Sequence, residues 1–225
     1  MVKKSFIIFG ASSEIALSFK QLCLEHGHTT LSISQNNNFD SLDSSIIKVK
    51  NYIDDFKAIK VKLQDYENIN IIFFNGALYE NRPIQFPSEE QIKMTEYINY
   101  TIPLELTKKL NAQIPGIQKF IYISSMAAVK YRYKNYIYGQ NKRKLEKSIQ
   151  DLNLNSYLIM RFGKVLTRMS EGHKNPPFTL SNTKAATLLM KKINSQGLVY
   201  PNFGLFVISI FLTLTPKKVI NKLNL

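Results

Sequence analysis

The feature that most constrains the fold of this chain is the regular alternation of short, β-branched segments with longer segments of helical periodicity. We expect strands at 4–9, 30–34, 46–50, 69–74, 119–124 and 156–162, and helices at 14–25, 54–66, 88–110 and 135–152. Neighbouring parallel strands need crossovers of about a dozen residues or more, which the helices supply. The alternation therefore predicts an α/β fold: a Rossmann-like, doubly wound parallel sheet of order 3-2-1-4-5-6, with room for a seventh strand.

The end of the chain differs in character from the rest. We expect one domain over residues 1–200, followed by a tail over 201–225. No charged residue occurs between positions 193 and 216, and 203–215 is almost wholly apolar. This run is shorter than the roughly 20 residues that span a bilayer. We expect an apolar helical tail that either packs as a core or interface helix or lies on a membrane surface, where the nearby lysines Lys191, Lys192, Lys217, Lys218 and Lys222 would meet anionic lipid.

The net charge is strongly basic, since 30 Lys and Arg against 16 Asp and Glu leave +14. This balance indicates an acidic partner: a phosphorylated small molecule, a phospholipid surface or nucleic acid. The cations are spread along the chain without a dense tract, so we expect a small, anionic substrate and no nucleic acid. One cysteine and three scattered histidines exclude a disulfide framework and favour no metal site. The opening residues do not form a signal peptide, so we expect a cytoplasmic protein, at most at the inner face of the membrane.

Two local patterns carry the chemistry. The first predicted strand opens into Gly10-Ala11-Ser12-Ser13-Glu14-Ile15, where small residues let the backbone approach a pyrophosphate at a helix N-terminus. Tyr138 and Lys142 stand four residues apart on a predicted helix and so share one face. An ammonium beside a phenol favours the phenolate, which makes the tyrosine a usable proton donor near neutral pH. Ser125 follows the fifth predicted strand, at the end where such sheets bind ligands.

These motifs, in this order, resemble the short-chain dehydrogenase/reductase family in its single-domain form, over about residues 4–167. The turn at 10–16 resembles the family's glycine-rich turn, with Glu14 and Ala16 in place of two glycines. The remaining matches are Asn75-Gly76-Ala77 for the Asn-Ala-Gly element, Asn99 for the asparagine of the long fourth helix, Ser125, Tyr138 and Lys142 for the catalytic residues, and 161–167 for the Pro-Gly-x-x-x-Thr segment, with Phe162 replacing the proline.

The resemblance implies a role for each residue. Tyr138 gives a proton to the substrate carbonyl, and Ser125 hydrogen-bonds that carbonyl as negative charge develops on it. Lys142 lowers the pKa of the tyrosine and holds the nicotinamide ribose, while Asn99 positions a water in the proton relay. Thr167 and the Val165 backbone hold the carboxamide. The likeness also implies a homodimer or homotetramer that pairs through the helices around Asn99 and Tyr138.

The family likeness predicts a nicotinamide dinucleotide, and the end of the second strand bears on which one. Ser34-Gln35-Asn36 offers no acid to bind a ribose diol, which favours NADP over NAD. We expect Asn51 to contact the adenine, with Lys50 as the alternative. The expected cofactor-binding residues are Gly10, Ser12, Ser13, Glu14, Ile15, Ser34, Asn51, Asn75, Gly76, Ala77, Tyr138, Lys142, Gly163, Val165 and Thr167.

The substrate is indicated by charge and by a narrower likeness. Lys130, Arg132 and Lys134 precede Tyr138, either as a solvated loop or as phosphate ligands at the mouth of the cleft. The Ser-Ser-Glu-Ile turn and the apolar tail resemble the polyprenylphosphoryl 2-keto-pentose reductases of cell-wall synthesis. This implies a reductase of a keto group on a phosphate-linked sugar, in surface polysaccharide or cell-envelope synthesis. The alternatives are a reductase of an acyl-thioester or small ketone, and a non-catalytic module that senses NADP.

Overall fold

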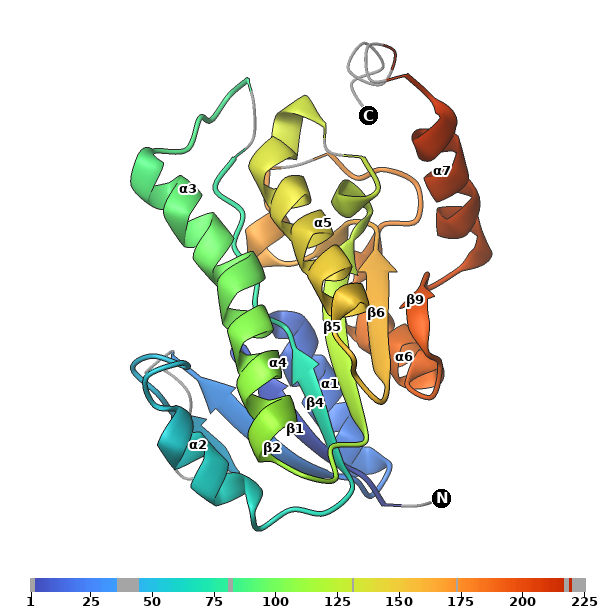
Figure 1. Ribbon diagram of the computed structural model, residues 1–225. Coiled ribbons are helices and arrows are strands. Elements are labelled where there is room, and N and C mark those ends of the chain that lie inside the picture. The colour runs from blue at the N-terminus through green and yellow to red at the C-terminus, as the bar shows by residue number, and fades with distance from the viewer. Residues whose placement is uncertain are drawn as a thin grey trace.

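A computed structural model describes residues 3–35, 45–80, 83–130, 132–172, 174–216 and 219. Its main sheet is parallel and seven-stranded, with the order β3-β2-β1-β4-β5-β6-β9 (Figure 1). The predicted doubly wound order is confirmed, and β9 is the seventh strand. The strands of this sheet are β1 (Ser5–Phe9), β2 (Thr29–Ser34), β3 (Ile46–Lys48), β4 (Ile69–Phe73), β5 (Lys119–Ser125), β6 (Tyr157–Phe162) and β9 (Gly197–Val199); β7 (Val165–Leu166) and β8 (Leu180–Ser181) pair with each other.

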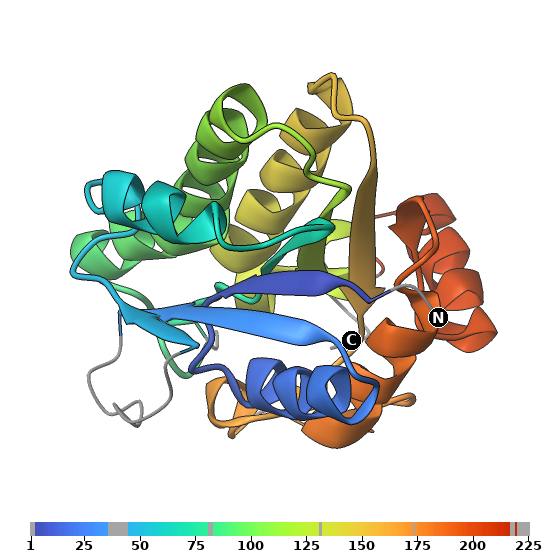
Figure 2. The ribbon, with the colours of Figure 1, turned by 90° about the horizontal axis from the view of Figure 1, so that it is seen from below.

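Helices cover both faces of the sheet (Figure 2). They are α1 (Glu14–Glu25), α2 (Phe56–Leu63), α3 (Glu89–Glu96), α4 (Ile102–Gln113), α5 (Tyr136–Asp151), α6 (Asn182–Lys192) and α7 (Phe203–Leu214). Alternate residues of β1 enter different cores: Phe6 and Ile8 pack on the face of α1 and α6, and Ile7 and Phe9 on the face of α2 and α4. A strand buried on both faces has no polar side, which is why 4–9 reads as a continuous apolar run.

The segment predicted as one helix over 88–110 contains a π-helical turn, Tyr97–Thr101, between α3 and α4. The turn carries Asn99. Pro103 follows at the start of α4 and has no backbone N–H to donate to the Asn99 carbonyl four residues earlier. The wider turn accommodates this proline, and such turns often carry functional residues. Ser88 and Gln91 form a capping box at the start of α3.

The region before α2 is shorter in regular structure than predicted. Strand β3 ends at Lys48 rather than 50, and α2 begins at Phe56 rather than 54. The Asp55 carboxylate accepts hydrogen bonds from the backbone N–H groups of Lys50 and Asn51, at 2.7 and 3.0 Å. The Asn51 side chain accepts one from the Ile53 N–H. These bonds stabilise a turn between strand and helix, as Asn and Asp side chains commonly do.

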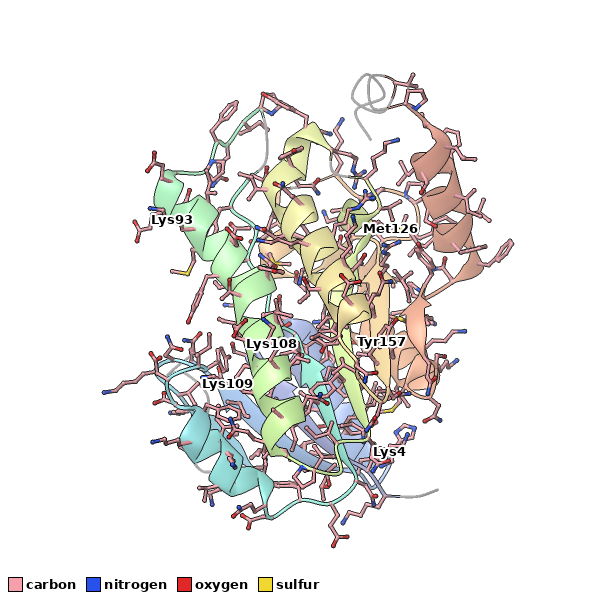
Figure 3. All side chains as sticks on the ribbon, in the orientation of Figure 1. Lys4, Lys93, Lys108, Lys109, Met126 and Tyr157 are labelled. Atoms are coloured by element: carbon pink, nitrogen blue, oxygen red, sulfur yellow. The ribbon has the colours of Figure 1, made fainter. Side chains whose placement is uncertain are left out.

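The apolar tail forms helix α7, as predicted. Its inner side packs through Leu205 and Leu212 against Met126 and Val129, which follow β5. Figure 3 labels Met126 near this helix. No helix in the described parts of the chain is both long and apolar enough to cross a bilayer. Of the lysines expected beside the tail, Lys217, Lys218 and Lys222 lie outside the described residues, as does Asn36 after β2.

Candidate active site

A cavity of about 210 Å³ lies at the carboxyl end of the sheet. Parallel doubly wound sheets bind ligands at this end because the strand ends and the helix N-termini meet there. Its walls come from the N-terminus of α1, the end of β4, the face of α5 that carries Tyr138 and Lys142, and the segment after β7. Its lining residues are Ser12, Ser13, Glu14, Ile15, Phe74, Asn75, Gly76, Ile123, Tyr138, Lys142, Thr167, Arg168 and Met169. Most of these were predicted from the sequence as cofactor-binding residues.

The turn before α1 requires a glycine at position 10. Gly10 has φ +72°, and a Cβ atom built there would lie 2.8 Å from the backbone nitrogen of Asn75. The glycine thus lets the turn after β1 lie directly against the residue that follows β4. The Ser13 side chain makes no capping hydrogen bond to α1. The first N–H groups of this helix therefore face the cavity without a side-chain acceptor from their N-cap, which suits a bound anion.

Glu14 stands at the first position of α1, where the sequence suggests a carboxylate that must avoid a pyrophosphate. Its Oε2 accepts a hydrogen bond from the backbone N–H of Arg168 at 2.9 Å. This bond links the start of α1 to the turn after β7, across the mouth of the cavity. The carboxylate is thereby directed to the loop rather than along the axis of the helix.

Tyr138 lies near the start of α5 and is 9% exposed. Burial raises the pKa of its phenol to about 12, and a hydrogen bond with the Ser125 side chain works in the opposite direction. The Ser125 Oγ also accepts a bond from the Ala127 N–H at 3.2 Å, which orients the serine at the end of β5. The structure therefore brings the two predicted hydroxyl groups together. The predicted lowering of the Tyr138 pKa by Lys142 is wrong, because burial of the phenol dominates, and at neutral pH the phenol keeps its proton.

Lys142 lies one turn further along α5 and is 4% exposed. Its Nζ donates to the backbone carbonyls of Asn75 and Ile123, at 3.2 and 3.1 Å. It lies 5.8 Å from the centre of the Tyr138 ring. Burial lowers the pKa of this ammonium to about 8, and the carboxylate of Glu146 partly opposes that shift. The lysine thus spans the ends of β4 and β5 beside the tyrosine.

Asn99 is fully buried in the π-helical turn. Its Nδ2 donates to the carbonyls of Ala77 and Thr95, each at 2.8 Å, and its Oδ1 accepts from the Ala77 N–H at 3.4 Å. The side chain therefore holds the segment after β4 in place. Tyr138 and Lys142 line the cavity, whereas Asn99 acts on the backbone of the site.

The remaining predicted cofactor residues have different surroundings, and only some of them line the cavity. Thr167 lines the cavity and caps the short turn after β7, and Val165 is buried behind it. Ser34 is buried at the end of β2. The Asn51 amide hydrogen-bonds to the Tyr97 hydroxyl at 3.0 Å, so its contact with an adenine stays a prediction. Gly163 lies against α7: a Cβ atom there would come 3.2 Å from the Leu205 side chain.

The three predicted substrate cations have different surroundings. The Lys130 ammonium donates to the backbone carbonyls of Thr213 and Thr215, at the end of α7. Burial lowers the pKa of the Arg132 guanidinium, and this group has no hydrogen-bond or ion-pair partner among the described residues. Lys134 lies in the short helical turn before α5. Of the three, Arg132 is the cation whose environment favours a bound anion.

Two buried carboxylates of the site were not predicted. Glu80 is 3% exposed, and its Oε2 accepts a bond from the Tyr138 backbone N–H at 2.8 Å. Glu146 is paired with Arg161 and accepts a bond from the Ser124 hydroxyl at 2.6 Å. Glu146 continues the four-residue spacing of Tyr138 and Lys142, so the helical period contained a signal for it. Glu80 comes from a distant loop, and no local pattern indicates it.

The cavity fits a nicotinamide dinucleotide in two respects. The Asn75 Oδ1 atom is buried and has no hydrogen-bond partner within the described ranges, and its residue lines the cavity. A buried acceptor without a donor is costly, so it indicates a ligand that supplies one. The uncapped N-terminus of α1 provides the site for the negatively charged part of such a ligand.

No protein-family model matches the chain. Solved structures share its fold. A short-chain dehydrogenase from Streptomyces avermitilis aligns with TM-score 0.74 at 15% identity, covering 99% of this chain and 98% of its own. A short chain dehydrogenase from Burkholderia cenocepacia J2315 in complex with NADP aligns with TM-score 0.73 at 15% identity, covering 95% and 98%. The 3-ketoacyl-(acyl-carrier-protein) reductase from Brucella melitensis, complexed with NADH, gives 0.72 at 12%, covering 88% and 97%. The chain therefore has the short-chain dehydrogenase fold.

Proposed function

We propose that this protein is an NAD(P)-dependent oxidoreductase of the short-chain dehydrogenase/reductase type, acting on a keto or hydroxyl group. The observation that carries the proposal is the meeting of Ser125, Tyr138 and Lys142 beside one cavity at the carboxyl end of the sheet. The Ser125 side chain lies close enough to the Tyr138 phenol to affect its pKa, so the two hydroxyl groups are placed to bind a single carbonyl oxygen. A buried ammonium next to them supplies the titratable group for proton transfer.

In the reductive direction, the Tyr138 phenol gives its proton to the substrate oxygen. The high pKa of the buried phenol keeps that proton in place until negative charge develops on the oxygen. Ser125 donates a second hydrogen bond to the same oxygen. Lys142, with a pKa near 8, can return a proton to the phenolate. When bound, the nicotinamide dinucleotide supplies the hydride.

The residues that would hold the cofactor are the first turn of α1, Asn75 with Gly76 and Ala77, and Thr167. We propose NADP as the preferred form, because β2 ends at Ser34 and is followed by Gln35, and neither residue has a carboxylate for a ribose diol. Titration with NADPH and NADH, followed by quenching of tyrosine fluorescence, tests the preference. Equal or tighter binding of NADH overturns it.

We propose a substrate that carries a phosphate group, such as a keto-sugar linked to a phosphate carrier in cell-envelope synthesis. The support is Arg132, a half-buried guanidinium on the segment leading to Tyr138, in a protein with a net charge of +14. A guanidinium that burial destabilises and that has no hydrogen-bond partner among the described residues favours an anion beside it.

The acid assignment is tested with Tyr138→Phe. We expect turnover of a keto substrate to fall at least about 100-fold, because the general acid is lost, while binding of NADPH persists. Tyr157→Phe is the matched control, since Tyr157 begins β6 at the opposite end of the strands. Near-normal turnover by the Tyr138 variant would show that another group supplies the proton.

The substrate class is tested with Arg132→Gln. For a phosphorylated keto-sugar we expect KM to rise roughly tenfold or more, while kcat for a small neutral ketone stays the same. Lys57→Gln, an exposed lysine on α2, is the control for net charge. An unchanged KM, or a clear preference for a 3-oxoacyl thioester, would exclude the phosphate role of Arg132.

A further inference from the structure

Helix α7 presents an unbroken apolar face to solvent. Phe203 and Leu214, at its two ends, are 77% and 78% exposed. At about 100° of rotation per residue, the exposed positions lie in one stripe opposite Leu205 and Leu212, which are buried. Thr213, whose hydroxyl donates to the Ser209 carbonyl, is exposed at the edge of the stripe, and the stripe itself contains no charged side chain. Its members are Phe203, Phe206, Val207, Ile210, Phe211 and Leu214.

The helix is held firmly in this orientation. Asn202 accepts a hydrogen bond from the Leu205 N–H at 2.9 Å and so caps its start. The Lys130 ammonium binds carbonyls at its end. Gly204 lies so close to the Phe178 ring that a Cβ atom would come within 2.3 Å of it. In Figure 1, α7 stands at the outer edge of the molecule beyond β9. These contacts fix the orientation of the apolar stripe, and the opposite side of the helix packs on the segment that follows Ser125.

A second cavity, of about 240 Å³, opens between α5 and α7. Arg143 and Lys147 of α5 line it together with Arg161, and Thr213 belongs to the flank of α7. The carboxylate among the lining residues, Glu146, is already paired with Arg161. The cavity therefore has an excess of positive charge directly beside the apolar stripe. Its volume is sufficient for a phosphate group with its adjoining atoms.

We propose that α7 lies in the surface of an anionic membrane, with its apolar stripe among the acyl chains and a lipid phosphate in the cavity lined by Arg143 and Lys147. Apolar side chains on one face of a helix and cations at its flank are the combination that binds such surfaces. The inference does not depend on the reductase activity.

A second copy of the chain fits this surface less well. One face of a helix about 18 Å long covers a few hundred Å², whereas a stable interface buries about 800 Å² on each partner. Two copies facing each other across α7 would also bring their cations together, which opposes association. An anionic bilayer complements the stripe and the cavity at the same time.

The charge part of the proposal is tested by flotation of the full chain with vesicles of phosphatidylcholine, alone or with an equal part of phosphatidylglycerol. We expect binding mainly to the mixed vesicles. The double substitution Arg143→Gln with Lys147→Gln should weaken that binding about 25-fold, at about fivefold per cation. Lys57→Gln with Lys62→Gln on α2 removes the same charge elsewhere and should change it little. Equal effects of the two pairs overturn the phosphate site.

The apolar part is tested with Ile210→Asp, an exposed position at the centre of the stripe. Binding to the mixed vesicles should fall at least tenfold, since a carboxylate enters the bilayer surface. Val61→Asp, on the exposed side of α2, is the matched control and should bind as the original protein does. Unchanged binding by the Ile210 variant overturns the proposal. The proposal is also overturned if the original protein does not float with vesicles and is instead a dimer in light scattering that Ile210→Asp dissociates.

Discussion

Two successive turns of α5 each bury a charged side chain, but only the second turn pairs its charge with one of opposite sign. Lys142 has only carbonyl oxygens as hydrogen-bond partners in the described structure, and burial lowers its pKa to about 8. Glu146, four residues on, is just as buried but pairs with Arg161 and accepts a bond from Ser124. The first turn keeps a destabilised, titratable group beside Tyr138, where the proposed mechanism uses one. The second turn uses a satisfied pair to hold α5 against β6.

The sharpest separation of the two turns is expected for Lys142→Met. Turnover should fall by a factor of about 10²–10⁴, because the group that returns a proton to the Tyr138 phenolate is lost. Stability should stay the same or rise, because a buried ammonium without a carboxylate partner is replaced by an apolar chain of similar length. Turnover and the denaturation midpoint measure both. Lys144→Met, which removes an exposed pair with Glu96, is the control. A clear loss of stability in the Lys142 variant would mean that both turns are structural.

In the turn that carries Glu146, we expect a substitution to lower the stability of the protein. Glu146→Gln leaves Arg161 without its charge partner at a site where the guanidinium side chain is only 16% exposed. We expect a loss of about 3–5 kcal/mol in the free energy of unfolding, measured with urea. Glu96→Gln breaks the exposed pair between α3 and Lys144 of α5 and should cost less than about 1 kcal/mol. Similar losses in the two variants would contradict the distinction.

The effect of pH gives a smaller test of the same contrast. The pKa of Lys142 is about 8 in the folded protein and 10.5 for an ordinary lysine. Between these values the unfolded chain binds the extra proton, so the stability of the protein should rise with pH relative to Lys142→Met. The gain is on the order of 3 kcal/mol across that window. Urea unfolding of both proteins between about pH 7.5 and 10.5, the range of the two pKa values, measures the difference in their free energies of unfolding. A falling difference would mean that Lys142 is stabilised in its charged form.

Local patterns predicted the fold and much of the site. Runs such as 4–9 and 69–74 are apolar on both faces, so their composition alone indicates central strands. The four-residue spacing of Tyr138 and Lys142 placed them on one face, and the structure shows both beside the cavity. Interruptions were harder to predict. Pro103 signals a break in the helix over 88–110, but the response to it, a π-helical turn at Asn99, depends on packing.

Contacts between distant segments could not be predicted from the sequence. Glu80 supports the backbone of Tyr138 from 58 residues away. Lys130, expected at the substrate, also binds the carbonyls that end α7. The Asn51 amide hydrogen-bonds to Tyr97, 46 residues further on. Each of these partners is chosen by proximity in space, and no periodicity along the chain records it.

The sequence by itself determined the order of the strands, the helix that carries Tyr138 and Lys142, and the apolar character of the tail. Periodicity and side-chain polarity are properties of residues that are close in sequence, so they do not depend on how the chain packs. Only the tertiary structure decided which buried charges are paired and which are not, and which side of α7 faces outward. Those properties depend on desolvation and on the distance between atoms of different elements, which exist only once the sheet and its helices have packed.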